Sequence, residues 1–403
     1  MSKIKEIKAE KIINSLGDWT IRTTAILSSG ATGSGEVPAG ISTGKFEATL
    51  VPPGQAIENI TSKISPELHG ENALNQKNID QLLLELDGTE RKGNLGGNAI
   101  LATSLAVCNA AAREQDIPLY QHIRNYFGFE ETASLPNPML LIIEGGKHGA
   151  ENLDIQEFMV IPPKKPSFEK TIEAGINIYK ETKKLLGEEG YATTVGTEGG
   201  FSPQKMNLNQ ALDIIEQACK NAHYEKVKIT LDVAANSFAS KTKYKLKGLS
   251  KTLSGTQLLD FYNDLKAKHP RLYSIEDPFD ENHLNLWKKA QKEWGDDLIV
   301  VGDDLLVTNP KKIKHAVENK LVGGAIIKPN QIGTISEAVE FSKIAQKGNL
   351  KTVVSHRSGE TNSSFIADLA FAINADFIKT GAPTRGERVA KYNRLLEIER
   401  SLG

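Results

Sequence analysis

The sequence has little cysteine and almost no excess charge of either sign. Only two of its 403 residues are cysteines, Cys108 and Cys219, which is too few for a disulfide framework or a cysteine-based zinc site. A reducing compartment fits this usage. The 49 lysines and arginines nearly balance the 50 aspartates and glutamates, and a net charge of −1 offers no general attraction to nucleic acid or acidic lipid.

Long apolar runs are also missing. Residues 1–8 alternate charged and apolar side chains, unlike a signal peptide. No stretch approaches the ~18 apolar residues of a membrane span. The 39% hydrophobic and 25% charged residues are ordinary for a globular chain and exclude a disordered or collagen-like one. We therefore expect a soluble, cytoplasmic protein with no membrane span and no nucleic-acid partner.

The length predicts two domains, since domains usually have roughly 100–200 residues and a barrel about 250. Residues 1–132 show strand patterns followed by helical patterns, separated by a glycine-rich stretch, 28–44. This order is typical of a small α+β domain. The expected strands are 4–13 and 20–27, and the expected helices are 75–86 and 98–113. A boundary is expected within residues 127–138, which contain two prolines and a glycine.

Residues 133–403 repeat a β-then-α pattern. Because parallel neighbours need a long crossover, such repeats predict a parallel α/β sheet. We expect a C-terminal (β/α)8-type barrel, with an open doubly wound sheet as the alternative. Segments 139–143 and 155–161 would complete the barrel. Six strands are clear, at 227–233, 272–276, 298–301, 324–328, 352–355 and 376–379.

Ionisable residues stand at the C-terminal ends of these six strands. Any one of them is usually a helix cap, a turn residue or half of an ion pair. Six at one barrel rim must instead compensate one another or hold a metal, because unpaired buried ions cost several kcal/mol each. The residues are Asp232, Glu276, Asp303, Lys328, the run His356-Arg357-Ser358, and Lys379.

Three of these residues, Asp232, Glu276 and Asp303, suit Mg2+ because carboxylates without cysteine or histidine favour a hard cation. Beside such an ion, Lys328 and Lys379 would have a lowered pKa, useful for a base. A metal that stabilises an enediolate, with a lysine that removes the proton, is a known arrangement of one enzyme superfamily.

A second set of candidate residues lies earlier in the chain. Glu198 is flanked by glycines in Val195-Gly196-Thr197-Glu198-Gly199-Gly200 and would serve as a general acid if Glu157 raised its pKa. His148 follows another Gly-Gly pair. Taken alone, these residues are also consistent with a plain turn and an ion pair.

Four motifs together resemble the enolase family. They are Ser355-His356-Arg357-Ser358-Gly359-Glu360-Thr361, Ile378-Lys379-Thr380-Gly381-Ala382-Pro383, Ser274-Ile275-Glu276-Asp277-Pro278-Phe279 and Lys328-Pro329-Asn330-Gln331-Ile332-Gly333. The first is highly specific. The resemblance runs from Ser42-Thr43-Gly44 to Arg388-Val389-Ala390-Lys391-Tyr392-Asn393, nearly the whole chain.

The resemblance implies a hydro-lyase, phosphopyruvate hydratase, which reversibly dehydrates 2-phosphoglycerate to phosphoenolpyruvate in glycolysis. It makes Lys328 the base and Glu198 the acid. Two Mg2+ ions are implied per site, the first held by Asp232, Glu276 and Asp303, the second arriving with substrate and capped by Ser42 when a mobile loop closes. Arg357 and Ser358 would bind the phosphate and Lys379 would lie beside the substrate carboxylate. The implied remainder of the pocket is His148, Gln156, Glu157 and His356.

The chain departs from the family pattern around the proposed acid. Thr197 replaces the usual Asp, and Glu144 the usual Asn before Gly-Gly; Leu16, Trp19 and Ala39 also differ. Without an acid at 197, the pKa of Glu198 would fall. Two alternatives stay open: a catalytically silent binding or structural protein on an enolase scaffold, and another dehydratase of the wider superfamily. Arg357 and Ser358 argue against the second.

A further departure suggests a homodimer contact. The family tends to have an acid where this chain has Arg22, and an Arg where it has Glu397. A double reversal of sign preserves attraction, whereas a single one would not. We hypothesise that Arg22 and Glu397 face each other across the interface of a homodimer, with coincidence on two solvated faces as the alternative.

Overall fold

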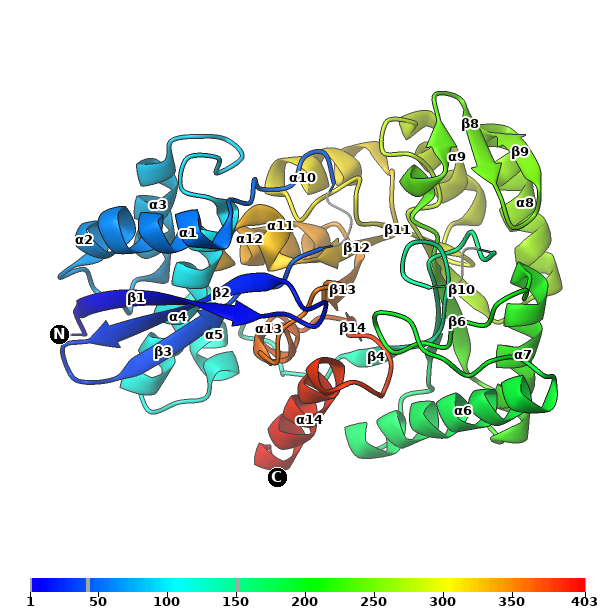
Figure 1. Cartoon of the computed structure of the whole chain (residues 1–403), viewed down its shortest axis with the longest axis horizontal. Helices are drawn as coiled ribbons and strands as arrows, with labels where there is room; N and C mark the ends of the chain where they lie inside the picture. Colours follow the sequence, from blue (N-terminus) through cyan, green and yellow to red (C-terminus); the bar gives the residue numbers. More distant parts are fainter. Residues whose placement is uncertain (1, 41–43, 150–151, 403) are drawn as a thin grey trace.

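The computed structural model describes residues 2–40, 44–149 and 152–402 (Figure 1). Its N-terminal part is an antiparallel sheet of β1 (Ile4–Ile13), β2 (Trp19–Leu27) and β3 (Thr32–Glu36). Both predicted strands are confirmed, with Ile7 opposite Ala25 in the register. Trp19, at the start of β2, is exposed.

Helices pack beside this sheet in the N-terminal part. The two predicted helices are confirmed as α3 (Gln76–Asp87) and α4 (Gly97–Glu114), and α4 is buried along nearly its whole length. The elements are α1 (Pro53–Asn59), the π-helical turn η1 (Ile60–Ile64), α2 (Ser65–Leu68), α3 (Gln76–Asp87), α4 (Gly97–Glu114) and α5 (Leu119–Phe127).

Strand β3 lies inside the glycine-rich stretch and was not predicted. Its glycines are there for packing: a methyl group on Gly33 would overlap the α4 backbone at Ala106 and Ala110, and one on Gly35 would lie 2.6 Å from Leu105 Cβ. Glycine therefore permits β3 to lie close against α4, a role that composition cannot distinguish from a loop.

The remainder of the chain closes an eight-stranded barrel, which confirms the barrel over the open sheet. Around the barrel, each strand pairs with the next one along the chain, and β14 pairs with β4. The strands are β4 (Asn137–Glu144), β5 (Glu157–Ile161), β6 (Lys228–Asp232), β10 (Leu272–Glu276), β11 (Ile299–Gly302), β12 (Gly324–Ile327), β13 (Lys351–Ser355) and β14 (Phe377–Lys379).

One strand contradicts the expectation of an all-parallel barrel. β5 runs antiparallel to both of its neighbours, β4 and β6. Its first residue, Glu157, stands opposite Glu144 and Asp232, which are the last residues of those neighbours. The start of β5 therefore lies at the rim where the other strands end.

Helices surround the barrel (Figure 1). The side chains of Asn207 and Ser254 begin α7 and α8 with capping boxes. A small sheet, β7 (Ala239–Ser240), β8 (Lys243–Leu246) and β9 (Lys251–Ser254), is inserted before α8. The helices are α6 (Phe168–Glu188), α7 (Leu208–Asn221), α8 (Gly255–Lys268), α9 (Leu284–Trp294), α10 (Pro310–Asn319), α11 (Pro329–Ile332), α12 (Ile335–Lys347), α13 (Phe365–Ala372) and α14 (Gly386–Ser401), with a 3-10 turn, η2 (Ala235–Ser237), after β6.

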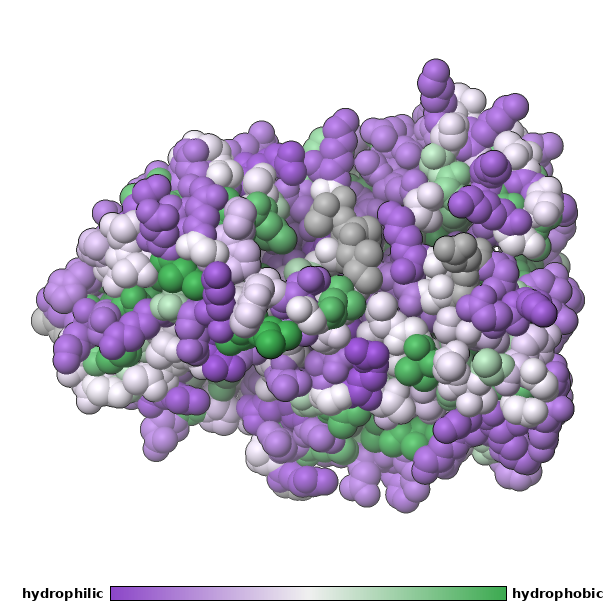
Figure 2. Space-filling view, in the orientation of Figure 1, coloured by the Kyte–Doolittle hydropathy of each residue, from purple (hydrophilic) through white to green (hydrophobic). Residues whose placement is uncertain are grey.

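The surface in Figure 2 is mostly hydrophilic, with apolar residues gathered only in small groups on that face. Across the described ranges, no helix combines the length and apolar character needed to span a bilayer.

Candidate active site

The rim of the barrel brings the predicted residues together. Asp232, Glu276 and Lys379 end strands β6, β10 and β14, while Asp303 and Lys328 directly follow β11 and β12. Glu276 joins the group through an ion pair with Lys379. One cavity is lined by His148, Gln156, Glu157, Glu198, Asp232, Asp303, Lys328, His356, Arg357, Ser358 and Lys379. Ser42 lies outside the described residues.

Each lysine is paired with carboxylates. Lys379 Nζ lies 2.8 Å from Asp232 Oδ2, 2.9 Å from Glu276 Oε2 and 3.2 Å from Glu157 Oε2, all buried. Lys328 Nζ donates to Asp303 Oδ2. Burial lowers the pKa of both lysines, but these carboxylates outweigh it and raise each pKa above its ordinary value. The sequence predicted a lowered pKa for both lysines, whereas the carboxylates raise it. A metal cation bound to the same oxygens would oppose this increase.

The rim carries more negative charge than the lysines neutralise. Burial, followed by repulsion from Asp232, raises the pKa of Glu276 to about 8, and burial with Asp303 raises that of Asp304 to about 7. Asp277, Asp303 and Asp304 offer ligand oxygens within 4.8 Å of one another. The predicted trio of Asp232, Glu276 and Asp303 does not form such a set among the described residues. Buried, oxygen-only, under-compensated carboxylates still fit a divalent cation such as Mg2+.

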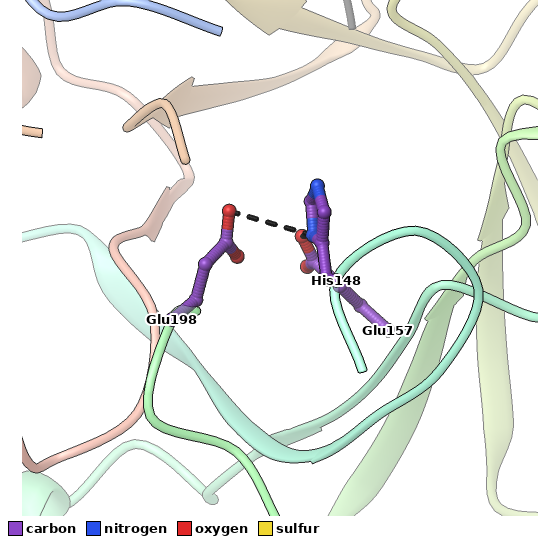
Figure 3. A group of neighbouring side chains, drawn as sticks. All are labelled: His148, Glu157 and Glu198. Atoms are coloured by element: carbon purple, nitrogen blue, oxygen red, sulfur yellow. Dashed lines mark ion pairs between the residues drawn. The ribbon is translucent and has the colours of Figure 1, made fainter. Parts of the chain in front are cut away.

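Glu198 reaches the cavity from the loop between α6 and α7 (Figure 3). Its Oε1 lies 3.5 Å from His148 Nδ1, and its Oε2 lies 3.3 Å from His356 Nε2. Burial lowers the pKa of His356 to about 3, so this ring is neutral. Its Nδ1 accepts a hydrogen bond from Arg388 Nη1 at 2.6 Å, which assigns the ring proton to Nε2, facing Glu198.

The two glutamates of Figure 3 differ in their proton affinity. Burial raises the pKa of Glu157 well above its ordinary value, despite Lys379. Burial also raises the pKa of Glu198, but His356, His148 and Arg388 outweigh it and hold that pKa well below its ordinary value. The expectation that Glu157 would raise the pKa of Glu198 is therefore wrong: the raised pKa belongs to Glu157.

Arg357 lines one side of the cavity and is paired there with a carboxylate. Its Nη1 and Nη2 donate to the two carboxylate oxygens of Glu47, at 3.0 and 3.2 Å, and Nη1 also donates to Asn330 Oδ1 at 3.1 Å. Ser358 Oγ lies 3.0 Å from His148 Nε2. A buried guanidinium that holds a carboxylate with both arms has the geometry for phosphate as well.

Sequence reasoning did not assign Glu47 or Arg388 a role. Arg388 is fully buried and donates to the carbonyl oxygens of Arg357 and Ser358, both at 2.6 Å. It therefore shapes the backbone of the loop that carries Arg357 and Ser358. Its motif was recognised, but nothing in a helical pattern reveals a buried arginine. Glu47 comes from the N-terminal part, and a contact over that separation leaves no local signal.

Two lysines paired with carboxylates, two glutamates of contrasting pKa and a buried arginine meet at one rim. These features define an acid–base enzyme built on a (β/α)8-type barrel.

Comparisons with known proteins agree with this class. Residues 4–123 match the family model described as enolase, N-terminal domain, and residues 132–403 match enolase, C-terminal TIM barrel domain. The chain is 43% identical to the enolase of a Nitratiruptor species over 415 residues, covering all of this chain and 97% of that relative. The chain belongs to the enolase family.

Proposed function

We propose that this hydro-lyase of the enolase family interconverts 2-phosphoglycerate and phosphoenolpyruvate, the glycolytic reaction. The observation that carries the proposal is the single cavity shared by Lys328, Glu198 and Arg357. It holds a base, an acid and a bidentate phosphate-binding group, which this dehydration requires.

In the proposed reaction, Lys328 takes the proton from C2 of the substrate, and Glu198 assists departure of the C3 hydroxyl. Glu157 and Glu198 have carboxylate oxygens within 4.8 Å of each other, so the pair can hold the required proton, with Glu157 as its main carrier before substrate binds. Arg357 and Ser358 bind the phosphate, and Lys379 lies on the substrate-carboxylate side. The other lining residues of the proposal are His148, Gln156 and His356.

We propose Mg2+ as the cofactor, with two ions per site. Asp232, Glu276 and Asp303 would hold the first, and Ser42 would contact the second. When bound, Mg2+ stabilises the negative charge that develops on the substrate carboxylate as the C2 proton leaves. The protein's part is to supply the oxygen ligands and to keep Lys328 paired and oriented until substrate arrives.

The first test is the growth of ultraviolet absorbance when 2-phosphoglycerate is added with Mg2+. We expect steady growth that falls to background after chelation with EDTA and returns when Mg2+ is restored, because the rim carboxylates otherwise repel the developing charge. A parent protein without signal in Mg2+ would favour the silent scaffold over the enzyme.

We also propose that the protein is a cytoplasmic homodimer and that its chain divides near residues 132 and 133. Arg22 Nη2 lies 2.6 Å from Glu36 Oε1, and Arg394 Nη1 lies 3.1 Å from Glu397 Oε2. Glu36 and Glu397 line the same surface groove, so the two charges of the hypothesised interface pair lie near one face.

The interface pair predicts a charge-reversal pattern. Because like charges across an interface repel, we expect Arg22→Glu and Glu397→Arg each to weaken the dimer about tenfold or more, and the double variant to restore it. Analytical ultracentrifugation measures the dimer dissociation constant. Glu188→Arg, an exposed position at the end of α6, is the matched control and leaves that constant unchanged. A monomeric parent, or single variants that dimerise normally, would reject the pair.

A further inference from the structure

A third glutamate lies behind the proposed acid and does not line the cavity. Glu144 is the last residue of β4 and is 0% exposed. Its Oε1 accepts the backbone N–H groups of Glu198 at 3.0 Å and of Gly200 at 2.6 Å, and its Oε2 lies 3.2 Å from the same Glu198 nitrogen. The carboxylate therefore binds the backbone of the residue whose side chain enters the cavity.

The loop is shaped around this carboxylate. A methyl group on Gly196 would overlap Glu144 Oε2, and one on Gly200 would lie 2.9 Å from Glu144 Cγ. Gly196 N–H donates to the carbonyl oxygen of Gly200 at 2.9 Å, which closes the loop over the carboxylate. Two glycines of the Val-Gly-Thr-Glu-Gly-Gly motif thus leave the space that the Glu144 side chain fills.

The end of the loop is fixed on the same strand. Phe201 N–H donates to Ile142 O, and Glu144 N–H donates to Phe201 O, both at 2.8 Å. Other hydrogen bonds also hold the tip: Thr197 N–H donates to His148 O at 3.2 Å, Ala382 N–H donates to Glu198 O at 3.0 Å, and the Tyr179 hydroxyl donates to Gly199 O at 2.7 Å. Glu144 is the side chain that receives two of the tip's amides, so its position sets the direction in which Glu198 leaves the backbone.

The side chain of the residue before the acid takes no part in this support. Thr197 Oγ1 is buried and has no hydrogen-bond partner among the described residues. The acidic neighbour of Glu198 in this chain comes instead from β4. Burial and then Glu198 raise the pKa of Glu144 to about 8, so the two carboxylates interact.

We propose that Glu144 is the positioning residue of Glu198: its carboxylate oxygens, by accepting the amides of Glu198 and Gly200, hold the Glu198 side chain between His148 and His356. The role rests on the proposed function of Glu198, since a positioning residue acts only through the group it positions. A hydrogen-bond acceptor that reaches both amides is what the role needs.

Three substitutions of Glu144 distinguish the need for a hydrogen-bond acceptor at this distance from the need for a negative charge. Glu144→Gln keeps a carbonyl oxygen at the same distance, Glu144→Asp withdraws the carboxylate by one methylene, and Glu144→Ala removes it. With 2-phosphoglycerate and Mg2+, we expect kcat to fall about 100-fold for Ala and Asp, since a misplacement of about 1 Å costs that much. KM stays within about threefold of the parent value. For Glu144→Gln we expect kcat to fall by less than about threefold. Glu189→Ala, just after α6 and outside the cavity lining, is the control.

Hydrogen–deuterium exchange gives a readout that needs no activity. The amides of Glu198 and Gly200 should lose protection in the Ala and Asp variants and keep it in Gln. A Glu144→Asp variant with the parent's kcat and the parent's amide protection would overturn the proposal. A Glu144→Gln variant with as low a kcat as Glu144→Ala would also overturn it, as would variants in which only KM rises. If the Glu144→Ala variant does not fold, the comparison of Glu144→Asp with Glu144→Gln tests the proposal. A parent inactive toward 2-phosphoglycerate would reject the proposed function, while the exchange data still decide whether Glu144 holds the loop.

Discussion

Replacing Lys328 with alanine is expected to lower kcat for 2-phosphoglycerate about 10⁴-fold. A positioned base contributes roughly 10²–10⁴-fold, and a carbon acid depends on it fully because water in a closed cavity is a poor substitute. Lys328 directly follows β12, has 12% of its side chain exposed and donates to Asp303. The alanine side chain can neither accept the C2 proton nor hold that carboxylate. Absorbance growth at saturating substrate and Mg2+ measures the loss.

The matched control for Lys328 is Lys170→Ala, an exposed lysine of α6 that does not line the cavity. It should keep the parent rate. Exchange of the C2 hydrogen of 2-phosphoglycerate with solvent separates the base from other roles, because loss of the base stops exchange as well as dehydration. A Lys328→Ala variant that still exchanges this hydrogen at the parent rate would assign the base elsewhere.

Replacing Arg388 with methionine is expected to lower the free energy of unfolding by about 3–5 kcal/mol. The guanidinium is fully buried and satisfies the carbonyl oxygens of Arg357 and Ser358 and the Nδ1 of His356, each at 2.6 Å. Methionine fills similar volume but donates nothing, so several buried acceptors lose their partner. Urea denaturation followed by circular dichroism measures the change.

The control for Arg388 is Arg400→Met, an exposed arginine on the same helix, α14, which should change stability by less than about 0.5 kcal/mol. If Arg388→Met were as stable as the parent, the carbonyl oxygens around it would have to find other donors, and the assigned role of Arg388 in shaping the loop of Arg357 and Ser358 would be wrong.

The fold was readable from the sequence where hydrophobic patterns were regular. Strands β1 and β10 and helices α3 and α4 appear almost where the patterns placed them, because each buries one consistent face or is buried throughout. β3 was missed because its glycines resemble a loop. The reversed direction of β5 was missed because a buried strand reads the same in either direction.

The candidate site was readable for a different reason. In a parallel barrel the ends of successive strands meet, so Asp232, Glu276 and Lys379 could be placed together from sequence alone. Glu157 was predicted from its local sequence only as a neighbour of Glu198, since it starts its strand instead of ending it, and the family resemblance then implied its place in the pocket. Glu47 and Arg388 act through contacts between segments far apart in the chain, and their local sequence carries no sign of those partners.

The antiparallel β4–β5 pair also affects the order in which the site can assemble. Glu144 and Glu157 stand opposite each other in the ladder and are only 13 residues apart in the chain, so this pair closes at small entropic cost. The pair of Arg357 with Glu47 spans 310 residues. Contacts over such separations require most of the chain to be in place. The Glu144–Glu157 pair can therefore form early in folding, whereas the side of the cavity that contains Arg357 is completed only when the first and last thirds of the polypeptide have met.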